Sequence, residues 1–178
     1  MQHDLFSSLD SFLSVPAGSG GLLIRDVAGQ YRPAEADEVL LAAQRLLAAQ
    51  VRSSDLMDSP AVVKDFLRAR MGNLPHEVFA VLHLDSQNRV VDYVEMFRGT
   101  VSQTSVYPRE VVRDALILNS SALVLVHNHP SGVSQPSRAD EHLTQAIKQA
   151  AALVDVRVLD HFIVSVDSIR SMAEMGLV

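Results

Sequence analysis

The sequence predicts an α/β fold, a mixed β-sheet flanked by helices with an N-terminal helical extension. Residues 77–84 and 90–97 are rich in strand-forming residues and flank a polar turn at 85–89, which is typical of a β-hairpin. Beyond the hairpin, segments with helical periodicity alternate with short apolar runs. The helical segments are 108–119 and 137–153, and the apolar runs are 122–127 and 156–166. Helices and strands in this order are expected to form a sheet covered by helices.

Length and composition are those of a globular protein. A chain of 178 residues is long enough for one domain with a full core and a helical appendage. Hydrophobic residues make up 48% and charged residues 20%, which excludes a disordered chain. No apolar run approaches the roughly 20 residues that span a bilayer, so we expect no membrane association. The first residues carry an acid, Asp4, and no basic cluster, so we expect no signal peptide.

The net charge and the absence of cysteine indicate which binding partners and which cellular compartment to expect. The net charge is -6 and the pI is about 5.6, so the chain has no general attraction for the phosphates of DNA. The absence of cysteine excludes disulfides and thiolate metal sites, and it is compatible with a cytoplasmic location. The oligomeric state stays open, a homodimer included.

The first 74 residues predict a flexible start followed by two helices. Residues 4–13 are expected to form a short helix, and residues 16–21, rich in Gly, Ser and Pro, a flexible turn. Residues 34–51 have strong helix propensity. A second helix begins at Ser59-Pro60, an N-cap followed by proline at the first helical position, and ends at Gly72. Its basic side, which we interpret as a solvated face, carries Lys64, Arg68 and Arg70.

The strands and helices that follow have clear boundaries. The hairpin consists of a strand at 77–84 and a returning strand at 90–97, and residues 100–106 are expected to form a third strand. Pro108 opens the next helix, and a short helix is expected after the last strand, which ends at Val166.

Two histidines and an aspartate are the candidate metal ligands of this sequence. His127 and His129 lie at the end of the apolar run 122–126, and side chains at i and i+2 of a strand point to the same face. Asp140 follows a loop rich in Pro, Ser and Gly, at the start of a helical segment. Two imidazoles and one carboxylate are a common ligand set for a catalytic zinc, whose fourth position holds water.

The combined spacing of the histidines, the serine and the aspartate indicates a metal site more specifically than either short motif does alone. A lone His-x-His often only hydrogen-bonds, and Ser137-x-x-Asp140 is also the pattern of a capping box. The two interpretations of Ser137 and Asp140 are compatible, because a capped first turn would aim Asp140 at the histidines. Together these residues follow the pattern His-x-His-Pro-x6-Ser-x2-Asp, at His127, His129, Pro130, Ser137 and Asp140.

This pattern resembles the motif of the JAMM, or MPN-plus, metalloprotease superfamily. Its flanks resemble the RadC-like branch, with Pro-Arg-Glu at 108–110, His-Asn-His-Pro-Ser-Gly at 127–132 and Leu-Asp-His at 159–161. The resemblance runs from about Pro75 to the end of the chain. It implies a cytidine-deaminase-like MPN/JAB domain over residues 75–178, with residues 1–74 as an N-terminal segment.

The resemblance implies roles for particular residues. His127, His129 and Asp140 match the zinc ligands, and Ser137 matches the serine that stabilises the oxyanion. Glu77 matches the glutamate that hydrogen-bonds the metal-bound water and serves as general base. The function implied is zinc-dependent hydrolysis of peptide or isopeptide bonds, with a protein or peptide as substrate. Glu95, on the returning strand, is the competing candidate for the base, although it lacks the Glu-x-Phe context.

Other histidine sites fit less well. Metallo-β-lactamase-like sites need an aspartate where this chain has Ser131, and amidohydrolase barrels need a longer chain. For His161 we favour a satisfied core histidine over a residue that orients a ligand. For Arg109 and Arg113, one turn apart on a helix, a surface face is favoured over an anion site.

A second hypothesis from the same family is a RadC-like DNA repair or DNA-processing protein, either a DNA-binding protein or a metal-dependent nuclease. Longer RadC-like proteins carry an N-terminal helix-hairpin-helix region, and residues 1–74 show no such hairpin. Two-metal phosphodiester chemistry needs more carboxylates than Asp140 alone. DNA therefore stays an open partner that the net charge does not support. The third hypothesis is an interaction module that binds no metal.

Overall fold

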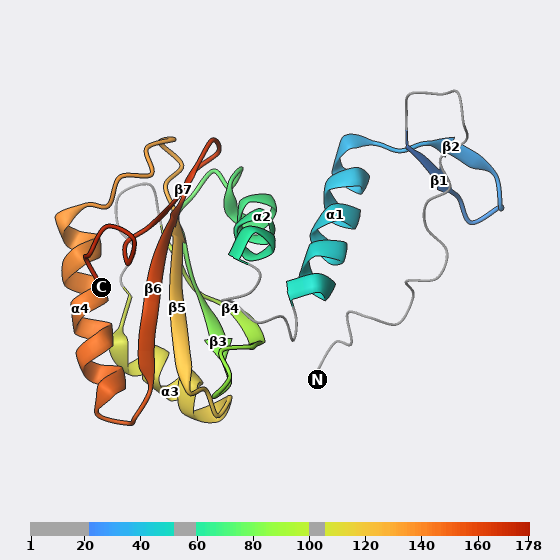
Figure 1. Cartoon of the computed structure of the whole chain (residues 1–178). Coiled ribbons are helices and arrows are strands. Elements are labelled where there is room, and N and C mark those ends of the chain that lie inside the picture. The colour runs from blue at the N-terminus through green and yellow to red at the C-terminus, as the bar shows by residue number, and fades with distance from the viewer. Residues whose placement is uncertain (1–21, 52–59, 100–105) are drawn as a thin grey trace. The chain divides into compact units, whose positions relative to one another are not determined.

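The computed structural model describes residues 22–51, 60–99 and 106–178 (Figure 1). The chain divides into two compact units between Ala43 and Gln44. The domain boundary expected between residues 74 and 75 stays a prediction, and the helix and turn expected within residues 4–21 lie outside the described residues. None of the helices in the described ranges combines the length and the apolar character needed to cross a membrane.

The first unit contains a small hairpin that the sequence did not predict. Its strands are β1 (Leu23–Arg25) and β2 (Tyr31–Pro33), paired antiparallel. The turn between them is held by Asp26, whose Oδ1 accepts from the backbone N–H groups of Ala28 (2.9 Å) and Gln30 (2.8 Å). Three-residue strands are too short for an alternating pattern, so the sequence carries little periodic signal for them.

The two predicted N-terminal helices are confirmed as α1 (Ala36–Val51) and α2 (Pro60–Met71). Gly72 ends α2, and its N–H donates to the Arg68 carbonyl at 2.9 Å. A Cβ at this position would lie only 2.7 Å from that oxygen, so the close approach requires glycine. Ser59, the predicted N-cap, lies outside the described residues.

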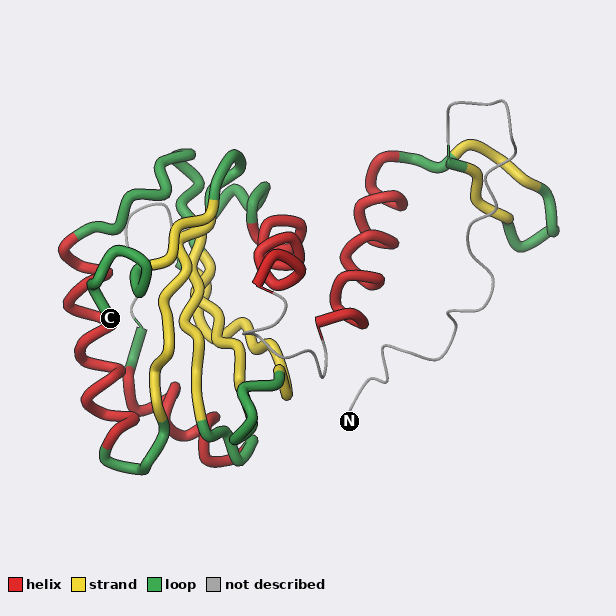
Figure 2. The backbone as a smooth tube through the Cα atoms, in the orientation of Figure 1, coloured by secondary structure: helices red, strands yellow, loops and turns green. Residues whose placement is uncertain are grey.

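The second unit is built on a five-stranded mixed sheet, which confirms the predicted fold class (Figures 1 and 2). The strands, in chain order, are β3 (Val78–Leu84), β4 (Val90–Arg98), β5 (Ala122–Asn128), β6 (Arg157–Val164) and β7 (Ile169–Ser171). Their spatial order is β4-β3-β5-β6-β7. Only β5 and β6 are parallel, and the chain joins them through α4 (Arg138–Ala152).

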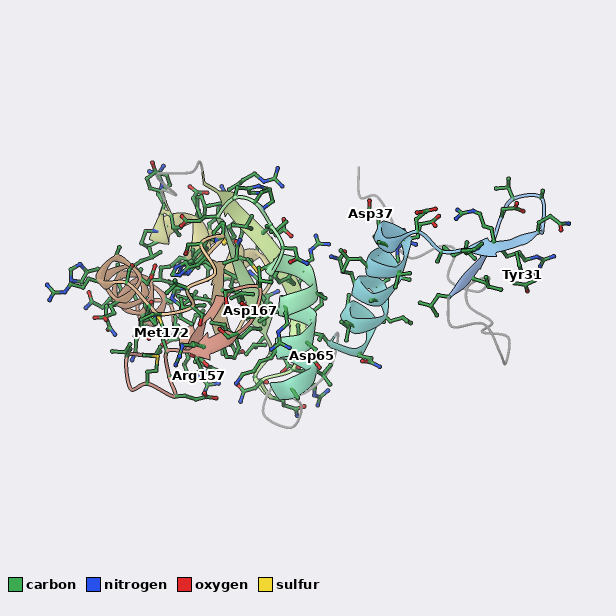
Figure 3. The ribbon with its side chains drawn as sticks, turned by 90° about the horizontal axis from the view of Figure 1, so that it is seen from above. Tyr31, Asp37, Asp65, Arg157, Asp167 and Met172 are labelled. Atoms are coloured by element: carbon green, nitrogen blue, oxygen red, sulfur yellow. The ribbon has the colours of Figure 1, made fainter. Side chains whose placement is uncertain are left out.

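Helices cover both faces of this sheet. In Figure 1, α2 lies on one face, while α4 and α3 (Pro108–Ile117) lie on the other. Seen from above, α2 with Asp65 and α4 stand on opposite sides of the sheet, and Met172 lies on the α4 side (Figure 3). Every residue of β3 and β5 is buried, because these two strands have neighbours on both edges and helices over both faces. Their ends therefore form a rigid base for a site.

One expected element lies almost wholly outside the described residues, and another differs from the structure. The third strand is expected at 100–106, of which the structure describes only Val106, and Val106 is not in a strand. The short helix expected after the last long strand is wrong, since β7 and a turn occupy this stretch. The Asp160 carboxylate stabilises the arrangement by accepting from Ser171 Oγ (2.6 Å) and from the Ala173 N–H (2.9 Å).

Candidate metal centre

The end of β5 brings the two histidines to one edge of the sheet. Along β5, the side chains of Leu123, Leu125 and His127 share the face covered by α3 and α4. His129 directly follows the strand, and its N–H donates to the Val164 carbonyl at 2.8 Å, which continues the pairing with β6. The alternation thus extends to His129, and the two imidazoles lie side by side.

The imidazoles present ring nitrogens to each other. His127 Nε2 and His129 Nε2 are 2.7 Å apart. His129 Nδ1 lies 2.6 Å from the Val133 carbonyl oxygen, which can only accept. Nδ1 therefore carries the proton of a neutral ring, and the lone pair of His129 Nε2 points at His127. Gly132, with φ of +83°, makes the turn that brings the Val133 carbonyl to this position.

Asp140 completes the group from the first turn of α4. Its Oδ1 lies 3.2 Å from His127 Nε2, and its Oδ2 lies 3.7 Å from His129 Nε2. One candidate ligand atom from each of the three residues lies within 4.8 Å of the other two. The structure thus brings together the three residues that the sequence nominated as metal ligands.

A capping box holds Asp140 in place. The Ser137 N–H donates to Asp140 Oδ2 at 2.6 Å, and the Asp140 N–H donates to Ser137 Oγ at 3.2 Å. Burial alone would raise the pKa of Asp140, but the contact with His127 and the hydrogen bonds from Ser137 hold that pKa well below its ordinary value. Asp140 is therefore a carboxylate.

These residues could hold a metal ion. Two imidazole nitrogens and one carboxylate oxygen form a ligand set that leaves a fourth tetrahedral position open. The side chains of His127, His129 and Asp140 are 10%, 15% and 13% exposed, so the group is sheltered and still reachable by water.

Glu77 lies at the same edge of the sheet, one residue before β3. Phe79 pairs with His127 across the sheet and therefore shares its face. The Gly99 N–H donates to the Glu77 carbonyl at 2.8 Å, which continues the β3–β4 pairing one residue beyond the strand end. By alternation, half-buried Glu77 belongs to the face of Phe79 and His127.

Glu95, the competing candidate, is on the wrong face. It pairs with Ala80, which packs in the core cluster on the α2 side. Its Oε1 accepts from Arg70 Nε of α2 at 2.9 Å. Glu95 is therefore separated from the histidines by the sheet, and this alternative is wrong.

Three polar residues around the site, His161, Thr144 and Asn128, were not assigned to it from the sequence. His161 is fully buried. Its Nε2 lies 2.9 Å from His127 Nδ1, and its Nδ1 lies 2.6 Å from Thr144 Oγ1. It is a satisfied core histidine, as favoured, and it also contacts a candidate ligand. Burial lowers the pKa of His161 well below its ordinary value, so the ring is neutral. The third residue, Asn128, bonds the backbone on both sides of Glu77.

The basic residues singled out in the sequence are on the surface. Arg109 is 82% exposed and stacks over the Tyr107 ring. Arg113 pairs with Glu110 at 2.7 Å. Neither contact creates an anion site, in line with the interpretation of a surface face.

Comparison with known proteins places these residues in a family. A family model described as "RadC-like JAB domain" matches residues 57–177. The chain is 54% identical over 168 residues to UPF0758 proteins of Leptothrix cholodnii and of Methylibium petroleiphilum, covering 90% of this chain and 76% of each relative. A UPF0758 protein of Polaromonas is 56% identical over 149 residues, covering 84% of this chain and 66% of the relative.

Proposed function

Because this chain belongs to the RadC-like JAB domain family, we propose that it is a zinc-dependent metallohydrolase that cleaves peptide or isopeptide bonds. The observation that carries the proposal is the convergence of His127, His129 and Asp140, with candidate ligand atoms within 4.8 Å of one another. The cytoplasmic location expected from the cysteine-free sequence is part of the same proposal.

The reaction needs a base and a proton carrier beside the metal. When bound, zinc would supply a Lewis acid for the carbonyl and would lower the pKa of the attacking water. Glu77 then takes a proton from that water as the C–O bond forms, and it delivers the proton to the amine nitrogen as the C–N bond breaks. Its place on the His127 face supports this role.

Ser137 is suited to stabilise the oxyanion. In the capping box its oxygen accepts from the Asp140 N–H, which holds the Ser137 hydroxyl beside Asp140 at the metal group. Ser137 is exposed and lies at the N-terminus of α4, where backbone dipoles also favour negative charge. The same residue would thus orient Asp140 and stabilise the developing charge.

The surroundings favour a peptide over DNA. On α2, the basic side chains are paired with acids, in the contacts Lys64–Glu174, Arg68–Asp65 and Arg70–Glu95. Within the described residues, the candidate metal group contains one carboxylate, which is too few for the usual two-metal phosphodiester chemistry. β4 is the outermost strand on one side of the described sheet, and its end at Arg98 pairs with Val78 near the site. An extended peptide could add to such an edge.

The test is a cleavage screen with matched glutamate variants. Zinc-loaded wild type, Glu77→Gln and Glu95→Gln are incubated with a peptide library, and new amino termini are identified by mass spectrometry. We expect wild type and Glu95→Gln to cleave, and Glu77→Gln to keep zinc but lose about 100-fold or more in turnover. Full turnover by Glu77→Gln would refute its role as base. Cleavage of DNA but not of peptides by wild type would refute the proposed substrate class.

A further inference from the structure

We propose that His161 and Thr144 are positioning residues that fix the His127 ring with its Nε2 lone pair directed at His129 and Asp140, a role that rests on the function proposed above. Neither residue belongs to the ligand motif. His161 lies on β6, the parallel neighbour of β5, and Thr144 lies on α4, one turn after Asp140.

The contacts form a continuous chain from one candidate ligand to another. His127 Nδ1 and His161 Nε2 are 2.9 Å apart. His161 Nδ1 and Thr144 Oγ1 are 2.6 Å apart, and the Thr144 hydroxyl donates to the Asp140 carbonyl oxygen at 2.6 Å. The chain therefore begins at the ring of one ligand and ends at the backbone of another.

The donor and acceptor of each hydrogen bond in this chain of contacts follow from the last acceptor, the Asp140 carbonyl oxygen. A carbonyl oxygen only accepts, so the single hydroxyl proton of Thr144 points to Asp140. Thr144 Oγ1 must then accept from His161 Nδ1–H. His161 is fully buried and its ring nitrogens contact a hydroxyl and an imidazole, so we assign it one ring proton, which leaves a lone pair on Nε2. That lone pair accepts from His127 Nδ1–H, so the lone pair of His127 is on Nε2, as metal binding requires.

The surroundings hold this chain rigid. His161 and Thr144 are both fully buried, and the edge of the His161 ring meets the Phe79 ring at 5.9 Å between centroids. Met172 Sδ lies 3.8 Å from Thr144 Oγ1 and packs against the hydroxyl. Because both residues are fully buried, removing the His161 side chain would leave His127 Nδ1 without its partner, and the His127 ring could then adopt either tautomer.

The chain offers a matched control at the other end of β3. His83 is also fully buried, and its Nδ1 lies 2.8 Å from Ser120 Oγ. It pairs with Leu123, near the start of β5, whereas Phe79 pairs with His127 near the end of that strand. A substitution of His83 therefore removes a comparable buried imidazole without touching the metal group.

The test measures zinc affinity by competition with a chromogenic chelator. We expect His161→Leu and Thr144→Val to raise the dissociation constant for zinc about 10- to 100-fold. His161→Gln, which can still accept from His127, and Thr144→Ser, which keeps the hydroxyl, should recover most of the affinity. His83→Leu should bind zinc as wild type does. Equal losses in His83→Leu and His161→Leu, or no loss in His161→Leu, would overturn the proposal.

A second readout separates this inference from the proposed function. Nitrogen-15 NMR of the wild-type chain should show His161 as a neutral ring protonated at Nδ1. A ring protonated at Nε2 would reverse the chain and overturn the inference, whether or not zinc binds. If wild type binds no zinc, the proposed function fails while the tautomer of His161 still decides the inference.

Discussion

Asn128 shows how a single side chain can join the two halves of the site. Its Oδ1 accepts from the Val78 N–H at 2.7 Å, and its Nδ2 donates to the His76 carbonyl at 3.0 Å. These two backbone groups flank Glu77. The residue between the two histidines therefore fixes the backbone from which the proposed base projects.

Replacing Asn128 should affect stability and turnover but not metal content. Asn128→Ala leaves the buried Val78 N–H without its acceptor, which should lower the free energy of unfolding by about 1–3 kcal/mol. Turnover should fall because Glu77 loses its backbone support. Urea denaturation and metal analysis check both effects. Loss of zinc with normal turnover per bound zinc would contradict this account of Asn128.

His83 makes stability depend on pH. Its burial lowers the pKa of the ring below the ordinary value of 6.5, although Asp114 and Asp92 oppose the shift. Below that ordinary value the unfolded chain takes up a proton before the folded chain does, so the stability contribution of His83 is lost as the pH falls.

We therefore expect His83→Leu to flatten the acid side of the stability profile. Urea unfolding at about pH 5 and about pH 8 should show a smaller difference for the variant than for wild type. Part of the slope should remain, because buried His161 titrates in the same direction. A profile identical to that of wild type would contradict the assignment.

At the scale of elements, the N-terminus of α4 serves the helix and the site together. Ser137→Ala removes the acceptor for the Asp140 N–H and should lower the free energy of unfolding by about 1 kcal/mol. It should also weaken zinc binding, because Asp140 loses its orientation. Ser137→Thr keeps the capping hydroxyl and is the matched control. Thermal unfolding measures stability, and chelator competition measures zinc affinity. A fully stable Ser137→Ala variant with unchanged zinc affinity would contradict this dual role.

The long elements were predictable because their sequence patterns extend over many residues. α4 has helical periodicity and β3 and β5 are apolar runs, whereas β1, β2 and β7 have three residues each and depend on pairing partners. The three candidate ligands were predictable because they lie close together in the sequence. The contact of His161 with His127 was not favoured, because it depends on the parallel register that sets Leu125 against His161. No local pattern records that register.

At the scale of the whole second unit, the site lies where several elements end. β5 and the residue after its end supply the histidines, α4 supplies Asp140, and β6 supplies His161. A metal ion shared by β5 and α4 would therefore link two layers of the fold. Its binding free energy would add to the stability of the folded chain.

Zinc removal should accordingly destabilise the protein. At zinc concentrations about 100 times the dissociation constant, bound zinc should add about 2.7 kcal/mol to the free energy of unfolding. Thermal unfolding with zinc and with excess chelator checks this effect. His129→Ala should show no difference between the two conditions, and a zinc-induced shift of the same size in that variant would indicate binding elsewhere.

Metal analysis of the purified chain tests most directly whether His127, His129 and Asp140 hold one ion. After zinc supplementation and gel filtration, wild type should contain about one zinc ion per chain, and His129→Ala should contain none. A wild-type chain without zinc, or a His129→Ala chain that retains a full equivalent, would contradict the assignment of the metal centre.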